Sequence, residues 1–228
     1  MQQSTGHTLK AFDQDIERLR ALISQMGGLA EHAIDEAMRC LTQRDVEAAA
    51  EVVQNDKKLD ALEIETERRA VQLIALRAPM ASDLRDVVAA LKISGVVERI
   101  GDYAKNIAKR VPLVENAKIE PLSLLPEMAR MCVEMVHNVL NAFVERDAEA
   151  AVRVCERDSA VDDFYDSIFR TLLTHMMENP QNIGQSAHLL FVAKNLERIG
   201  DHATNIAEMV YYAATGEHMT DRPGKSAR

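Results

Sequence analysis

The sequence predicts an all-α protein built from two copies of a three-helix unit, and three observations support this prediction. Among 228 residues there are only 9 glycines, 6 prolines and 4% aromatic residues, a composition that favours helices over strands and frequent turns. Apolar residues recur at helical spacing through several long segments. One segment also returns almost unchanged later in the chain, which indicates an internal duplication.

The duplication is clearest where ERIGDYAKNIA at 98–108 returns as ERIGDHATNIA at 197–207. A looser repeat lies upstream, where residues 44–60 resemble residues 146–162 and both begin with Arg-Asp. The offsets, 99 and 102 residues, are nearly equal. One unit has therefore been duplicated, with a small change of length between its second and third helices.

Each unit is expected to contain three helices. They span 9–41, 46–76 and 84–114 in the first unit, and 122–144, 147–177 and 183–214 in the second. Asp45 and Ser82 are expected to be N-caps of the second and third helices, while Pro79 and Pro180 separate these helices in the two units. Long helices joined by short turns pack as antiparallel bundles, and the prolines disfavour the alternative of a coiled-coil rod.

The expected domain organisation follows from these helices. It consists of a first repeat at 8–115, a linker at 116–126, a second repeat at 127–215 and a polar tail at 216–228. Two prolines in the linker and the polar composition of the tail place the boundaries.

Charge and composition narrow the class of protein. The formal charge of −9 and the pI near 5.3 argue against a general nucleic-acid binder, whose affinity comes from Lys and Arg. The chain contains neither an apolar stretch of about 18 residues that would span a membrane nor an apolar secretory signal. Cys40, Cys132 and Cys155 show no disulfide or zinc-site spacing. We therefore expect a soluble cytoplasmic protein.

Four pairs of acidic residues stand four positions apart, so each pair shares one helix face. Glu98 and Asp102, for example, continue an apolar stripe that includes Val88. The complete set is Asp56, Asp60, Glu98 and Asp102 in the first unit and Asp158, Asp162, Glu197 and Asp201 in the second. A carboxylate directed toward a core must be neutralised, paired or bound to metal, because an isolated buried charge is very costly.

The sequence therefore predicts one multi-carboxylate metal site in each unit. Carboxylate oxygens suit hard or borderline cations, and the identity stays open among Mg²⁺, Mn²⁺, Fe and Zn²⁺. Candidate supporting residues are Arg99, Asn106, Arg198 and Asn205. The alternative is that the acids form ion pairs on a solvated face, with the two arginines as partners. Lys194 interrupts the apolar stripe of the second site. Gly101 and Gly200 indicate close helix approach or room for a ligand.

The repeated segments and the acidic pairs make the chain resemble the PhoU family of phosphate-transport regulators. The resemblance extends over nearly the whole chain. The turn RAPMASDLR at 77–85 is also similar to that family. The resemblance implies that the four acidic pairs are metal-binding motifs. It also implies a cytoplasmic, often dimeric protein that works with the phosphate ABC transporter and a sensor histidine kinase. Such a protein would damp phosphate uptake and repress the phosphate-starvation response when phosphate is plentiful.

Two other functions are left open beside this regulatory one. A ferritin-like carboxylate-bridged redox enzyme would need Glu-x-x-His on each of two helices. Only Glu134 and His137 fit that pattern, and the first unit has no counterpart. No phosphate-binding loop or nucleophile elbow is present in the sequence either. The leading expectation is thus a regulator without enzymatic activity, and a metal-free helical adaptor is the third reading.

Overall fold

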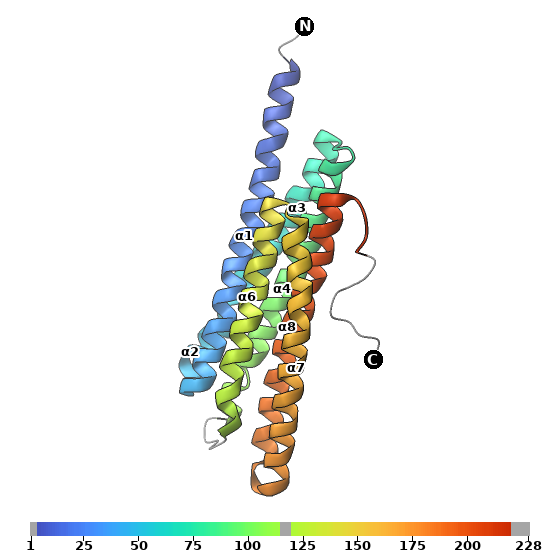
Figure 1. The fold of residues 1–228 in the computed structure, drawn as a ribbon. Coiled ribbons are helices and arrows are strands. Elements are labelled where there is room, and N and C mark those ends of the chain that lie inside the picture. The colour runs from blue at the N-terminus through green and yellow to red at the C-terminus, as the bar shows by residue number, and fades with distance from the viewer. Residues whose placement is uncertain (1–3, 115–119, 220–228) are drawn as a thin grey trace.

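The computed structural model describes residues 4–114 and 120–219, with side chains for 12–114 and 122–219. Within these ranges every regular element is helical, so the predicted all-α fold is confirmed (Figure 1). The first repeat contains α1 (Ser4–Gln43), α2 (Val46–Asn55), α3 (Lys57–Arg77), α4 (Ser82–Ala108) and α5 (Val111–Val114). The second contains the 3₁₀ turn η1 (Glu120–Leu124), α6 (Leu125–Glu145), α7 (Ala148–Glu178), the 3₁₀ turn η2 (Pro180–Asn182) and α8 (Ile183–Thr215).

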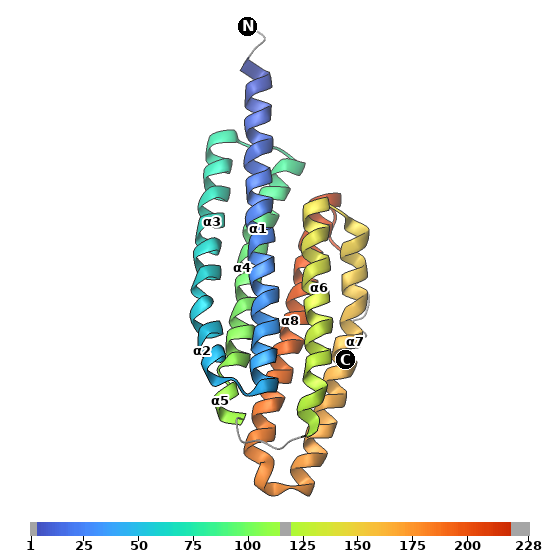
Figure 2. The same ribbon diagram turned by 90° about the vertical axis from the view of Figure 1, so that its left-hand side faces the viewer.

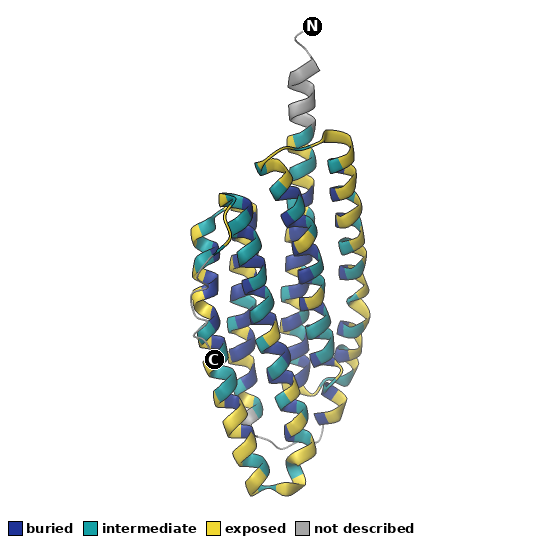
Figure 3. Ribbon diagram, turned by 90° about the vertical axis from the view of Figure 1, so that its right-hand side faces the viewer, coloured by how far each residue is buried: buried dark blue, intermediate teal, exposed yellow. Residues whose placement is uncertain are grey.

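The helices run along one common long axis, with the two repeats side by side (Figure 2). Helices α1 and α4 of the first repeat pack against α6 and α8 of the second, while α3 and α7 lie at the outer sides. Buried residues follow the inner helices, and exposed residues gather on the outer faces and at the ends of the bundle (Figure 3). The two predicted repeats therefore share one continuous hydrophobic core. No described helix is both long and apolar enough to cross a membrane.

The turn between the first two helices is the same in both repeats. Asp45 accepts a hydrogen bond from the Ala48 N–H at 3.0 Å, and the equivalent Asp147 accepts one from Ala150 at 2.9 Å. The residue before each aspartate has a positive φ, 59° in the first repeat and 57° in the second. The predicted N-cap at Asp45 is confirmed, because its extended backbone lets the carboxylate reach a free N–H group.

Several local predictions differ from the structure. The third helix predicted at 84–114 is divided into α4 and α5 by a turn at 109–110. Ser82 is the first residue of α4 and makes no cap, because the capping position is Ala81 at a φ of 49°. The second helix predicted at 46–76 is interrupted at Asp56, whose carbonyl accepts from the Leu59 N–H at 2.8 Å in a tight turn. Its counterpart α7 is continuous. Residues 116–119 of the predicted linker and 220–228 of the predicted tail lie outside the described residues, and α6 begins inside the predicted linker.

A buried ion cluster joins the two repeats. Asp86 of α4 is only 7% exposed, and its Oδ2 lies 3.0 Å from Arg20 Nη2 of α1. The same oxygen lies 3.4 Å from Nη1 of Arg146, in the turn between α6 and α7. Burial raises the pKa of Asp86, while the positive charges of Arg146 and Arg20 oppose that rise. Arg146 thus links the second repeat to the first.

We expect Asp86→Ala to lower the free energy of unfolding by about 1–3 kcal/mol. Removing one member of a buried pair leaves its partners uncompensated, although both arginines are partly exposed here, which reduces the loss. Urea denaturation measures the difference. Asp163→Ala, at an exposed position of α7, is the matched control and should change stability by less than about 0.5 kcal/mol. Equal stability of the two variants would contradict the prediction.

Candidate functional site

The first cluster of carboxylates lies between the α2–α3 junction and α4. Asp56 stands at the junction, Asp60 follows in the first turn of α3, and Glu98 and Asp102 come from α4. The pKa of Glu98 is raised by burial and then by the negative charges of Asp102, Glu63, Asp60 and Asp56. The structure thus brings the four predicted acids of the first repeat together, and it adds Glu63.

A lysine also belongs to this first cluster. Lys105 Nζ donates hydrogen bonds to Asp56 Oδ2 and, at 2.5 Å, to Asp102 Oδ1. Burial lowers the pKa of Lys105, but the hydrogen bonds to Asp102 and Asp56 outweigh burial and raise it above its ordinary value. A charged ammonium group therefore bridges acids from two different chain segments. Sequence reasoning missed this role, although the three-residue separation from Asp102 was a signal for it.

The second cluster lies between α7 and α8. Asp158 is 6% exposed, and Glu197 accepts a hydrogen bond from Lys194 Nζ to Oε1 at 2.7 Å. Glu197 Oε2 is buried and has no hydrogen-bond partner among the described residues. Asp162 and Asp201 lie about one turn further along their helices and are partly exposed. A buried carboxylate oxygen without a partner is costly, which marks this place as one that a cation would stabilise.

Cys132 of α6 lies beside the second cluster. Its Sγ donates to the Leu196 carbonyl at 3.1 Å. Burial raises the pKa of the thiol to about 12, a hydrogen bond with Gly200 opposes this, and the charges of Asp158 and Glu197 add to it. The cysteine stays a neutral thiol at neutral pH. No spacing in the sequence indicated that it lies next to these acids.

The two clusters differ in where their lysine comes from. Thr204 stands at the position equivalent to Lys105, is fully buried and donates to the Asp201 carbonyl at 2.7 Å. Lys194, whose counterpart in the first repeat is Gly95, supplies the ammonium group of the second cluster. The duplication therefore preserved the acids but not the cation that faces them.

Donor chemistry and geometry can be compared with what a metal ion requires. Among residues 12–114 and 122–219, no three His, Cys, Asp or Glu side chains are grouped so that they could hold a metal ion. In the first cluster, the Lys105 ammonium lies between two of the predicted ligands. In the second cluster, the unpartnered Glu197 oxygen and the nearby Asp158 carboxylate are donors of the type that hard cations prefer. The residues of the second cluster fit a metal ion better than those of the first.

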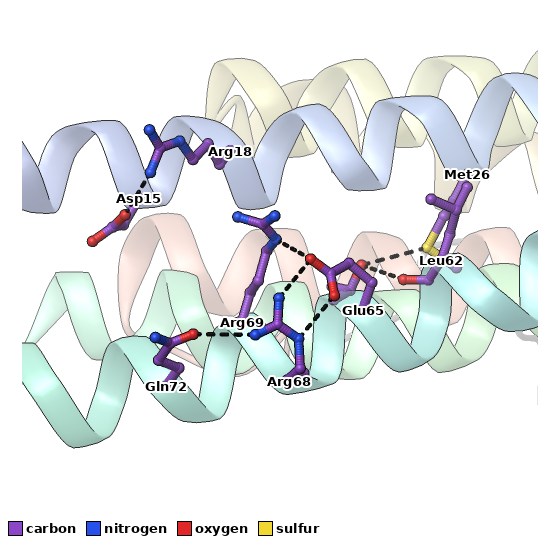
Figure 4. A network of polar contacts seen from close by, with 9 residues as sticks. Asp15, Arg18, Met26, Leu62, Glu65, Arg68, Arg69 and Gln72 are labelled. Carbon is purple, nitrogen blue, oxygen red and sulfur yellow. Dashed lines mark hydrogen bonds and ion pairs between the residues drawn. The ribbon is translucent and has the colours of Figure 1, made fainter.

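Glu65, two residues after Glu63 in α3, is neutralised within its own helix. Glu65 of α3 accepts from Arg69 Nε at 2.5 Å and from Arg68 Nη2 at 2.8 Å (Figure 4). The hydrogen bonds from Arg68 and Arg69 lower the pKa of Glu65 to about 2. Glu65 therefore belongs to a surface network and not to the carboxylate cluster.

The two glycines of the repeated segment lie where helices approach closely. A Cβ atom on Gly101 would lie 2.4 Å from Leu59 Cδ2, whereas on Gly200 its nearest neighbour would be Val161 Cγ1 at 3.4 Å. Both sites also face an aspartate of the cluster, Asp56 or Asp158, at 3.5 Å. Close helix approach, one of the two predicted explanations, accounts for Gly101.

We expect Gly101→Ala to lower the free energy of unfolding by about 1 kcal/mol, because the buried Leu59 must move to accept the new methyl group. Gly200→Ala is the matched comparison in the other repeat. It should be neutral or stabilising by up to about 1 kcal/mol, since alanine favours helix and meets no clash. Urea denaturation of both variants measures the difference, and equal effects would contradict the explanation.

The repeated segments also meet each other directly. Tyr103 and His202 occupy equivalent positions, and the Tyr103 hydroxyl lies 3.2 Å from His202 Nε2. Their ring centroids are 5.3 Å apart. Because equivalent residues are in contact, an approximate twofold axis relating the repeats passes between them. Sequence reasoning missed this contact, although the equivalence of the two positions was a signal.

Three of the four predicted supporting residues surround this contact. The Arg198 guanidinium lies 5.9 Å from the Tyr103 ring centroid, and Asn205 Nδ2 lies 3.2 Å from His202 Nδ1. The pKa of His202 is lowered by burial and by the positive charge of Arg99, which places Arg99 nearby. Asn106, the fourth, is a partly buried residue of α4. Their support of a metal site stays a prediction.

Glu134 and His137, the candidate ligands of an enzyme, take part in surface pairs. Glu134 Oε2 lies 3.0 Å from Arg157 Nη2, and His137 Nδ1 lies 3.3 Å from Glu31 of α1. Both pairs are exposed. The geometry of these residues gives no support to a ferritin-like centre.

The fold and the clusters define a class of protein: a duplicated helical bundle whose halves share one core and each carry buried carboxylates facing a lysine. A family model described as the PhoU domain matches residues 23–111 and 125–210. The chain belongs to the PhoU family.

Individual relatives agree with this assignment. A protein of Zymomonas mobilis described as "phosphate-specific transport system accessory protein PhoU homolog" is 57% identical over 95% of this chain and 92% of its own. One of Caulobacter vibrioides with the same description is 46% identical over 97% of both chains. The crystal structure of PhoU from Pseudomonas aeruginosa superposes with a TM-score of 0.85 at 34% identity, covering 90% of this chain and 100% of that one. A regulatory protein PhoU of Streptococcus pneumoniae gives the same score at 27% identity, over 91% and 99% of the chains.

Proposed function

We propose that this protein is a cytoplasmic regulator of phosphate uptake and phosphate homeostasis. It acts by binding the ATPase or permease of a phosphate ABC transporter and its sensor histidine kinase, and it represses the phosphate-starvation response. The observation that carries the proposal is the 57% identity, across nearly the whole chain, with a phosphate-specific transport system accessory protein. The match extends over both repeats, which supports a shared accessory role in phosphate transport.

The experiment is a deletion of the coding sequence in its own host, with a reporter fused to a promoter that phosphate starvation induces. In phosphate-replete medium the deletion should switch the reporter on, and the gene restored in trans should switch it off. Affinity purification from membranes of replete cells should recover the transporter ATPase or the sensor kinase. A reporter that stays off in the deletion strain, or the recovery of neither partner, would contradict the proposal.

The carboxylate clusters enter this proposal as metal sites. Asp56, Asp60, Glu98 and Asp102 would hold cations in the first repeat, and Asp158, Asp162, Glu197 and Asp201 in the second. A bound cation would neutralise carboxylates whose negative charges, after burial, raise the pKa of Glu98, and it would give Glu197 Oε2 a partner. The chain's own residues supply the ligands and the lysines that compete for them.

We also propose that the protein works as a homodimer. Sedimentation velocity of the purified chain tests this, with a single dimer-sized species as the expected result and a monomer at micromolar concentration as the contradictory one.

A further inference from the structure

A groove of about 620 Å³ lies between α4 and α8, and none of the eight cluster acids is among the residues that line it. The α4 wall carries Arg85, Lys92 and Arg99, and the α8 wall includes Met209 and Tyr212. These residues belong to none of the eight predicted ligand positions. Arg99 is one of the four predicted supporting residues, whereas the other four have no predicted role in the carboxylate clusters.

The three cations on α4 are spaced for a long ligand. Arg85, Lys92 and Arg99 are seven residues apart, so they share one helix face and span about 21 Å. Val88 and Val96 lie between them and make the lining between the charges apolar. Glu208 is the one acidic residue among those that line the groove. A protein with a net charge of −9 thus concentrates positive charge along one open face.

Contacts at both ends hold the walls in place. Arg85 Nε donates to the Ala213 carbonyl near the end of α8 at 3.4 Å, and the Tyr212 and His218 rings are stacked 4.6 Å apart. At the other end His202 is held by its hydrogen bond to Tyr103. The groove is therefore formed before any ligand arrives, which lowers the cost of binding.

The equivalent position in the other half of the pseudo-symmetric pair carries different residues. Phe191 occupies the place of Lys92, and Arg110 occupies the place of Met209, each at an offset of 99 residues. The Arg110 guanidinium lies 4.0 Å from the Phe191 ring centroid, so this cation is engaged within the protein. The stripe of three cations is consequently not repeated in the other half and is not a by-product of the duplication.

We propose that this groove docks an acidic amphipathic helix of a partner protein. Carboxylates at seven-residue spacing on that helix pair with Arg85, Lys92 and Arg99, and the apolar residues between them pack on Val88, Val96 and Met209. A row of charges about 21 Å long matches about four turns of helix and exceeds the size of a single small anion. The proposal rests on the proposed function only in that both require a protein partner.

The test uses the full purified chain and fluorescence anisotropy. The probe is a labelled synthetic helical peptide of about 18 residues, which is long enough to cover the basic stripe. It carries glutamate at every seventh position, and leucine or valine on the same helix face between the glutamates. The same peptide with glutamine for glutamate is the comparison. We expect the glutamate peptide to bind at least about tenfold more tightly, and more weakly as salt rises.

Variants of the protein locate the binding. Lys92→Glu should lower the affinity for the glutamate peptide by about tenfold or more. A peptide with lysine at the central glutamate position should bind that variant more tightly than the glutamate peptide does. Arg170→Glu, the same charge change at an exposed position of α7, should bind like the native chain. Circular dichroism of both variants shows whether they are folded, and the regained affinity shows that Lys92→Glu keeps a working groove.

Four outcomes would overturn the proposal. They are equal binding of the two peptides, native affinity in Lys92→Glu, displacement of the peptide by stoichiometric inorganic phosphate, and a change from dimer to monomer caused by Lys92→Glu. The third would assign the groove to a small anion and the fourth to a second copy of this chain. Peptide binding is measured without any phosphate response, so its failure leaves the reporter experiment standing, and the reverse also holds.

Discussion

Replacing Lys105 by methionine lowers the free energy of unfolding of the metal-free protein by about 2–3 kcal/mol. The Asp56 side chain, which is 7% exposed, then loses the ammonium group that compensates its charge, and removing one member of a buried pair is strongly destabilising. The partial exposure of Lys105 itself, 23%, keeps the loss below that of a fully buried pair. Urea denaturation in the presence of a chelator measures the effect.

The pH dependence of this difference has a definite sign. The pKa of Lys105 is raised above its ordinary value of 10.5, so its contribution to stability is complete below that pH and is lost as the pH rises through the folded-state pKa. The difference in the free energy of unfolding between the variant and the native chain should therefore be complete at neutral pH and should disappear in strong alkali. Lys109→Met, at the exposed C-cap position just after the same helix, is the control and should change stability by less than about 0.5 kcal/mol.

Adding a divalent metal connects this variant to the proposed site. If a cation can take the place of the ammonium group, Mn²⁺ or Mg²⁺ should stabilise Lys105→Met more than it stabilises the native chain. The absence of any metal-dependent recovery, together with an unchanged free energy of unfolding, would show that the first cluster needs no cation at all.

Asp102→Asn combined with Asp201→Asn should remove most of the metal from protein purified without chelator. Each substitution deletes one carboxylate ligand from one cluster, and a carboxamide is a much weaker ligand for hard cations. Metal content is measured by inductively coupled plasma mass spectrometry. Asp83→Asn combined with Asp163→Asn, two exposed acids outside the clusters, is the matched control and should keep native metal content.

The single variants give the sharper comparison. Asp201→Asn alone should lose more metal than Asp102→Asn alone, because Lys105 already occupies space between acids of the first cluster while the second offers a buried oxygen without a partner. Metal content that is unchanged in the double variant would overturn the metal proposal. An equal loss in the two single variants would show that Lys105 does not hinder binding.

The sequence predicts a helix boundary correctly where one residue interacts with its immediate neighbours. Asp45 was recognisable as an N-cap because a carboxylate before an apolar helical stretch can accept from a free N–H group three residues on, and the equivalent Asp147 makes the same cap. The prediction that Ser82 is an N-cap was wrong, because Ala81 holds the capping position of α4. Its positive φ depends on the conformation of the whole turn. The break at Asp56 was equally invisible, since helical periodicity continues across it.

The sequence by itself determined the duplication, the all-α fold and the alignment of acids with apolar stripes, because helical periodicity and residue spacing are local properties. Only the tertiary structure decided which side chains face these acids. Lys105 and Lys194 reach their clusters from non-equivalent positions, and Tyr103 meets His202 across the axis between repeats. It also decided that the repeats share one core and that one basic groove stays open. These features depend on how α4 and α8 pack. Contacts between segments that are distant in the chain produce no periodic pattern in the sequence.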